Sequence, residues 1–150
     1  FLFYDNSLQF AFMPKVETIG KSAFDSCPLT AVCFLKVKSV GYEAFCGCSQ
    51  LSQVFLPVCE QLGSCFDGCK KIKILSLPKA KKIGGWQFQS CSSLTDLIIP
   101  MVEEIGDDCF YNCGSLESID SKLDATKFRC AYDWCKENKW CPICRGQLQN

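Results

Sequence analysis

A phenylalanine recurs every 21 or 22 residues along most of this 150-residue chain. It stands at Phe3, Phe24, Phe45, Phe66, Phe88 and Phe110. Four further columns keep the same spacing. They are Cys27, Cys48, Cys69, Cys91 and Cys113, with Asn6 in the first slot; Leu8, Leu29, Leu51, Ile72, Leu94 and Leu116; Gly20, Gly41, Gly63, Gly84 and Gly106; and Pro14, Pro57, Pro78 and Pro100, with Leu35 in the remaining slot. Chance does not keep five columns in register over more than a hundred residues, so the chain is an internal repeat, and its period predicts a solenoid.

Between the Leu column and the Pro column, every second residue is apolar. The inward pairs are Ala11 and Met13, Val32 and Phe34, Val54 and Leu56, Leu75 and Leu77, and Leu97 and Ile99. Period-2 alternation predicts a strand with one buried face. Because one coil cannot bury its own apolar side, coils stack about 4.8 Å apart and their strands form a parallel sheet. We expect the Gly column to allow a tight corner and the Pro column to end each strand. The Ile-Gly-x-x-Ala-Phe half then returns as short extended pieces and turns.

The unit Leu-Pro-x-x-x-x-Ile-Gly-x-x-x-Phe-x-x-Cys-x-x-Leu-x-x-Leu resembles the BspA-type leucine-rich repeat over about residues 1–120. The resemblance implies a mainly-β, right-handed solenoid of five to six coils with a parallel strand ladder on one face. It also implies a role in adhesion or protein interaction, and a cell-surface or secreted location. The chain enters in mid-repeat at Phe3, so we expect a longer parent protein, or an oligomer formed through the open N-terminal coil.

Composition excludes several functions. Sixteen basic and sixteen acidic residues give zero net charge, which argues against a nucleic-acid partner. No apolar run approaches the ~18 residues of a membrane span, so we expect no membrane insertion. The chain has no histidine, which removes the commonest general base and the usual Ser/His and Cys/His nucleophile pairs. We therefore predict a protein that is not an enzyme.

The fourteen cysteines fall into groups. The Cys column is expected to be a ladder of buried thiols, because free cysteine behaves as a small apolar residue and an odd column is no pairing scheme. Cys65 and Cys109 take the slot of Ala23 and Ala44, so they also read as core. We expect Cys33, Cys46 and Cys59 to be partly exposed. Unpaired thiols suit a reducing, cytoplasmic compartment, in tension with the surface location that the family resemblance implies.

After Asp120 the columns stop, and residues 121–150 are expected to form a small, partly helical C-terminal cap. Four cysteines there, Cys130, Cys135, Cys141 and Cys144, could hold one structural zinc. Alternatively, Phe128, Ala131, Tyr132 and Cys135 fall on one face of an amphipathic helix that covers the last coil, with thiols or disulfides instead of metal.

The outward positions of the predicted strands carry the candidate binding residues. The partner-binding set is Phe10, Phe12, Phe55, Ile74, Asp96 and Ile98. A contiguous apolar patch on a solvated face marks an interaction surface, although missing parts of the protein could cover it instead. Lysines such as Lys81 and Lys82 gather in the middle coils and acids such as Glu103 and Glu104 in the last coil. This asymmetry fits either solvated turns or electrostatic steering of a partner.

Two functional hypotheses follow. The first is a non-enzymatic module that binds a protein partner, or adheres, through its strand face. The second is a small zinc- or thiol-dependent protein whose four-cysteine tail carries the function and whose repeats serve as a scaffold.

Overall fold

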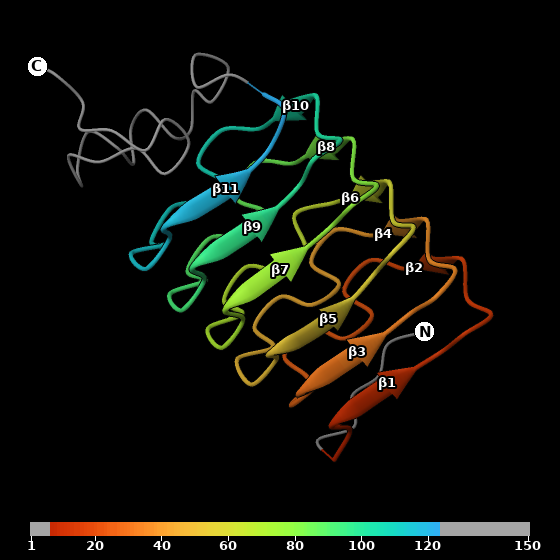
Figure 1. The fold of residues 1–150 in the computed structure, drawn as a ribbon. Helices are drawn as coiled ribbons and strands as arrows, with labels where there is room; N and C mark the ends of the chain where they lie inside the picture. The colour runs from red at the N-terminus through yellow and green to blue at the C-terminus, as the bar shows by residue number, and fades with distance from the viewer. Residues whose placement is uncertain (1–6, 124–150) are drawn as a thin grey trace, which may run out of the picture.

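The computed structural model describes residues 7–123, which form a parallel β-solenoid in which each coil crosses two sides of the molecule (Figure 1). Six strands of three residues line one side. They are β1 (Phe10–Phe12), β3 (Ala31–Cys33), β5 (Gln53–Phe55), β7 (Ile74–Ser76), β9 (Asp96–Ile98) and β11 (Ser118–Asp120). Five strands of two residues line the other. They are β2 (Thr18–Ile19), β4 (Ser39–Val40), β6 (Gln61–Leu62), β8 (Lys82–Ile83) and β10 (Glu104–Ile105).

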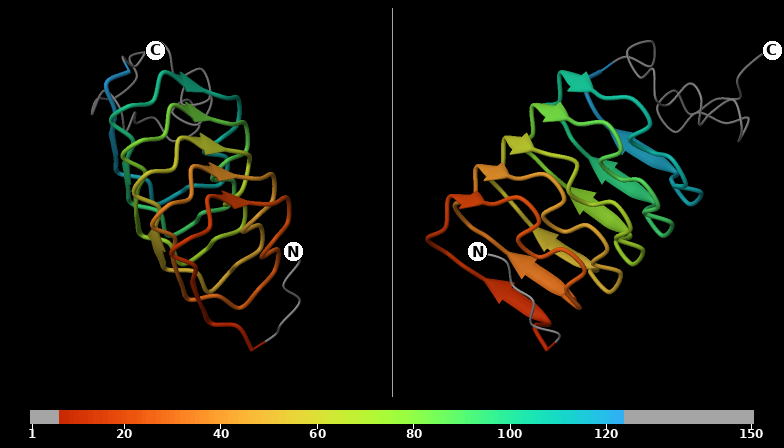
Figure 2. Two further views of the ribbon diagram at one scale, coloured as in Figure 1. Left: turned by 90° about the vertical axis from the view of Figure 1, so that its right-hand side faces the viewer. Right: turned by 180° about the vertical axis from the view of Figure 1, so that it is seen from behind.

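The predicted solenoid is confirmed, and the strands pair in parallel across consecutive coils. The short extended pieces predicted for the returning half of the repeat are two-residue strands, and they form one five-stranded sheet. The longer strands form two three-stranded sheets, β1-β3-β5 and β7-β9-β11, which lie side by side (Figures 1 and 2). Within residues 7–123 there is no helix, and therefore none that could span a membrane. Residues 124–150 of the predicted cap lie outside the described residues.

The Phe column forms the centre of the core. Phe24, Phe45, Phe66, Phe88 and Phe110 are each at most 1% exposed. Their rings stack on one another with centroids 5.5–6.1 Å apart and planes within 12° of parallel. This offset stacking of identical rings repeats one favourable contact at every coil step.

The Cys column lies beside the rings, and its thiols donate hydrogen bonds. Four of these thiols reach back to the backbone carbonyl of the ladder phenylalanine in the preceding coil. The S···O distances are 3.0 Å for Cys48 to Phe24, 3.2 Å for Cys69 to Phe45, 3.1 Å for Cys91 to Phe66 and 2.9 Å for Cys113 to Phe88. Asn6, which takes the first slot of this column in the sequence, lies outside the described residues.

The exposure predicted for Cys59 is wrong. Cys33 and Cys46 are half-buried, but Cys59 is fully buried. The physical reason is that Cys59 belongs to a sixth column. This column is apolar and lies two residues after the Pro column. Its members are Val16, Val37, Cys59, Ala80 and Val102. Cys65 and Cys109 are buried, as their column predicted, and the same column places a polar residue, Gln87, in the core.

The Gly column is explained by steric contact and not by a left-handed backbone conformation. None of its members has a positive φ; the left-handed residues of the same turn are Ser22, Glu43, Trp86 and Asp108. A Cβ on Gly106 would instead lie 2.4 Å from the backbone nitrogen of Gly85 in the preceding coil. A Cβ on Gly63 would meet the backbone nitrogen of Tyr42 at 2.8 Å. At Gly41, Gly63 and Gly106 the residue is therefore glycine because the backbones of neighbouring coils approach closely there.

Candidate interaction face

We define the strand face as the outward side of the six longer strands, β1, β3, β5, β7, β9 and β11. Strand pairing within each three-stranded sheet, continued from β5 to β7 by the repeat period, places its residues in two rows that run across the coils. One row is Phe10, Ala31, Gln53, Ile74, Asp96 and Ser118, and the other is Phe12, Cys33, Phe55, Ser76, Ile98 and Asp120. The alternation predicted from the sequence therefore sets all six candidate partner-binding residues on one side of the molecule.

Four of these candidates are large apolar side chains in contact with solvent. The exposed fractions are 56% for Phe10, 52% for Phe12, 53% for Phe55 and 61% for Ile74. Ile98 is only partly exposed. Single exposed apolar residues are common on proteins, but the pairing of Phe12 with Cys33 and of Cys33 with Phe55 joins the N-terminal ones into one patch.

Asp96 is the one charged candidate, and it is held in place. The Ser118 hydroxyl donates to one of its carboxylate oxygens at 2.5 Å, and the Thr95 hydroxyl donates to the other at 2.8 Å. These two hydrogen bonds, from Ser118 and then Thr95, lower the pKa of Asp96. Asp96 is thus an oriented anion on the strand face, a feature that the strand alternation alone did not reveal.

On the five-stranded sheet, lysine and glutamate side chains form ion pairs with each other. One row alternates in sign, with Glu17, Lys38, Glu60, Lys81 and Glu103 at spacings of 21 or 22 residues. Ion pairs join Lys38 to Glu17 at 3.3 Å and Lys81 to Glu60 at 2.7 Å. In the adjacent row, Lys82 pairs with Glu104 at 2.7 Å. Hydrogen bonding between Lys81 and Glu60 raises the pKa of the lysine and lowers that of the glutamate.

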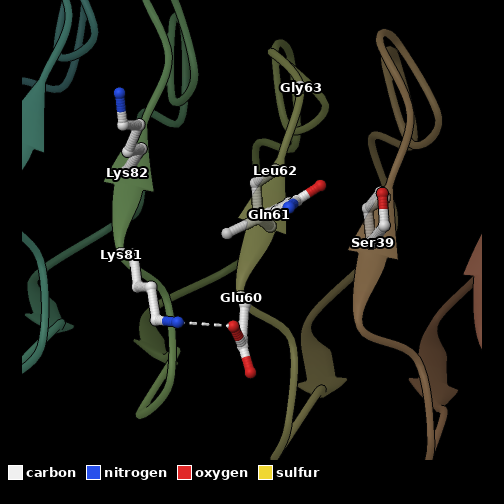
Figure 3. Close-up of a pocket in the computed structure, with 8 residues that line it drawn as sticks. Ser39, Glu60, Gln61, Leu62, Gly63, Lys81 and Lys82 are labelled. Carbon is white, nitrogen blue, oxygen red and sulfur yellow. Dashed lines mark hydrogen bonds and ion pairs between the residues drawn. The ribbon is translucent and has the colours of Figure 1, made fainter.

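A shallow hollow of about 420 Å³ lies over this second sheet. Figure 3 shows Gln61 and Leu62 at its centre, flanked by Ser39 and by the Lys81–Glu60 pair. Its charged side chains already have partners within the protein, since Lys82 pairs with Glu104 in the next coil. The lysine and acid segregation noted in the sequence therefore resolves, for these residues, into pairs between neighbouring coils.

Nothing in residues 7–123 groups three or more potential metal ligands. The ten cysteines of this part of the chain are thiols and form no disulfide. The predicted zinc ligands Cys130, Cys135, Cys141 and Cys144 lie outside the described residues, so zinc in the tail stays a prediction.

Comparison with known proteins agrees with this geometry. Residues 17–137 match the BspA type leucine rich repeat region, in six copies. A crystal structure of a T. pallidum leucine rich repeat protein is similar to the chain, with 30% sequence identity and a TM-score of 0.70 over 74% of this chain and 58% of that one. No curated protein matches the chain.

Two further structures share the architecture. A leucine rich cell surface protein from Faecalibacterium prausnitzii is 28% identical, with a TM-score of 0.69 over 80% of this chain and 34% of that one. A leucine-rich repeat protein from Bacteroides ovatus is 22% identical, with a TM-score of 0.70 over 83% of this chain and 40% of that one, which is evidence for the fold alone. The chain thus spans less than two thirds of each of these proteins.

Proposed function

Because the chain belongs to the BspA-type leucine-rich-repeat family, we propose that it is a non-enzymatic interaction module that binds a protein partner through its strand face. The partner-binding residues in this proposal are Phe10, Phe12, Phe55, Ile74, Asp96 and Ile98. The observation that carries the proposal is the set of exposed phenylalanine and isoleucine side chains on β1, β5 and β7. Exposed aromatic residues close together are typical of the centres of protein interfaces.

The contrast between the two sides of the solenoid supports this choice of face. The five-stranded sheet is polar and pairs its own charges through Glu17–Lys38, Glu60–Lys81 and Lys82–Glu104. Exposed ion pairs of this kind are typical of a surface that stays in contact with water. The strand face instead leaves apolar side chains in water, so a partner that covers them removes apolar area from solvent.

Adhesion is the more specific form of this proposal. One similar structure is a leucine rich cell surface protein, which supports a surface location for a protein of this architecture. The buried thiols support a reducing compartment instead. The state of the thiols in protein taken directly from its source distinguishes the two compartments, because disulfides form in the oxidising one.

The test is a capture experiment with the full chain as bait in three versions. The wild type is compared with the strand-face variant Phe55→Ser and with Gln61→Ser, an exposed residue of the second sheet. We expect a partner that the wild type and Gln61→Ser retain and that Phe55→Ser loses. Its binding is then measured with the purified partner.

Both substitutions lie at exposed positions, so neither is expected to change the free energy of unfolding by more than about 0.5 kcal/mol. Equal thermal stability of the three baits establishes that a loss of binding is local. A partner that is retained by Phe55→Ser and by the additional variant Phe12→Ser would exclude the strand face as the binding surface.

A further inference from the structure

The strand face changes its chemistry along the solenoid axis. On the sheet β1-β3-β5 the outward side chains include three phenylalanines and none that is charged. On the sheet β7-β9-β11 they include Asp96 and Asp120, and Glu117 directly precedes β11. The face is therefore apolar in its N-terminal half and acidic at its C-terminal end.

The acidic end is not neutralised by lysines in the part of the chain that the structure describes. The acidic residues that form ion pairs within residues 7–123 are Glu17, Glu60, Glu103 and Glu104. All four lie in or beside the second sheet. Asp96 receives hydrogen bonds from two hydroxyls, which stabilise its charge without cancelling it. Lys73 lies in the same row as Glu117, two strand spacings or about 10 Å away with Thr95 between them.

We propose that the occupant of the strand face is an extended protein segment with aromatic or branched aliphatic side chains at one end and lysine or arginine at the other. This inference rests on the proposed function. The apolar end of the segment covers Phe12 and Phe55, and its basic end lies against Asp96 and Asp120. Each longer strand offers only two outward positions, so the surface is a narrow stripe that suits one extended chain lying across the coils.

The geometry sets the spacing within the partner. Asp120 lies three strands beyond Phe55 and five beyond Phe12 in the same row. At about 4.8 Å per strand these separations are about 14 and 24 Å. An extended segment advances about 3.4 Å per residue, so its apolar and basic groups stand about four to seven residues apart.

Charge complementarity favours this occupant over a second copy of the chain. A symmetric pair that buried the phenylalanines of both copies would leave the acidic end of each copy without a counterpart. In contrast, an amphipathic basic segment satisfies both halves of the face at once. Electrostatic attraction at the acidic end also fixes the direction in which the segment runs.

A selection experiment tests the partner class without a known ligand. Random 12-residue peptides displayed on phage are selected on the full chain, and the most enriched sequence is synthesised for fluorescence-polarisation measurements. We expect enriched peptides to combine aromatic or aliphatic residues with lysine or arginine about four to seven positions away. Phe55→Ser should weaken binding by about tenfold or more, as loss of an interface anchor does.

The acidic end is tested by the double variant Asp96→Asn/Asp120→Asn. It should weaken binding severalfold and remove the loss of affinity that added salt causes in the wild type. Glu104→Gln, an acid of the second sheet that pairs with Lys82, is the matched control and should change nothing. All of these positions are on the surface, and equal thermal melting of the variants verifies that they fold alike.

The contrary outcomes separate the two proposals. The selected peptides could lose affinity with Phe55→Ser, lack basic residues and bind the Asp96→Asn/Asp120→Asn variant as tightly as the wild type. That result would contradict the proposed class of partner but would still support the strand face as a binding surface. Binding that is indifferent to Phe55→Ser, or a selection that yields no binder, would overturn both. If sedimentation measurements showed a wild-type dimer that Phe55→Ser converts to a monomer, the occupant would be a second copy of the chain and the inference would be wrong.

Discussion

The Cys69 thiol donates a hydrogen bond to the backbone carbonyl of Phe45, with 3.2 Å between sulfur and oxygen. The same carbonyl accepts a hydrogen bond from the backbone N–H of Cys48, also at 3.2 Å. Both lone pairs of this buried oxygen are thus used, one within its own turn and one by the next coil. Because the pattern recurs at Phe24, Phe66 and Phe88, the Cys column links consecutive coils as well as filling space.

The first prediction concerns this thiol. Cys69→Ala should lower the free energy of unfolding by about 1–3 kcal/mol, because it removes a buried hydrogen bond and leaves a small cavity. Cys69→Ser keeps a donor at the same position and should cost less. Urea unfolding of both variants measures the difference. Equal losses for alanine and serine would show that the column contributes by packing alone.

The second prediction is a loss of stability at alkaline pH. Burial raises the pKa of the Cys48 and Cys113 thiols to about 12, and a neighbouring cysteine adds to the effect at Cys48. The unfolded chain releases these protons from about pH 8.5, whereas the folded protein retains them up to about pH 12. The stabilisation is therefore complete below about pH 8.5 and decreases above it, by up to about 1.4 kcal/mol per pH unit for each thiol.

Urea unfolding at pH 7.5, 9 and 10 measures this slope. The double variant Cys48→Ser/Cys113→Ser is the control, since serine does not titrate in this range. Its stability should depend less steeply on pH than that of the wild type. Parallel curves for the two proteins would mean that these thiols do not control the alkaline transition.

The third prediction compares two phenylalanines of one coil. Phe66 is fully buried and its ring lies 5.6 Å from that of Phe45 and 6.1 Å from that of Phe88. Phe66→Ala should therefore destabilise by about 3–5 kcal/mol. Phe55 is 53% exposed, so Phe55→Ala should change stability by no more than about 0.5 kcal/mol. Chemical denaturation of the pair measures both values, and similar costs would contradict the assignment of one ring to the core and the other to the surface.

The fourth prediction uses two members of the Gly column. Gly106→Ala should destabilise by about 1–3 kcal/mol, because the new Cβ would lie 2.4 Å from the Gly85 nitrogen and the coils must move apart. Among residues 7–123, no atom lies within 4 Å of a Cβ built on Gly20, which belongs to the first described coil. Gly20→Ala should accordingly be neutral or slightly stabilising, since alanine restricts the unfolded chain. Thermal melting ranks the two variants; a larger loss for Gly20→Ala would refute the close-approach explanation.

The fifth prediction concerns thiol accessibility. Brief alkylation of the native protein, followed by peptide mapping, should label Cys33 and Cys46 before Cys48, Cys69 and Cys91. Alkylation of unfolded but unreduced protein should label all of these. Recovery of Cys48 joined to Cys69 by a disulfide would contradict the thiol ladder and indicate an oxidising compartment.

The sequence by itself determined the repeat, the strand face and most of the core. These follow from periodicity, because consecutive coils are one strand spacing apart and residues one period apart must therefore become neighbours. The columns of Phe66 and Cys69 and the outward position of Phe55 needed no further information. The same periodicity also contains a sixth column that includes Cys59, and a row of alternating charges from Glu17 to Glu103. The five predicted columns did not include them.

Only the tertiary structure decided what each side chain meets in the next coil. These contacts depend on the path of the backbone, which changes when a turn is one residue longer or shorter. The close approach at Gly106, the thiol-to-carbonyl bonds, the hydroxyls that hold Asp96 and the separation of β5 from β7 into two sheets are all of this kind. Periodicity specifies which residues are neighbours, whereas distances of a few ångströms between stacked coils specify whether they collide, donate a hydrogen bond or carry an unneutralised charge.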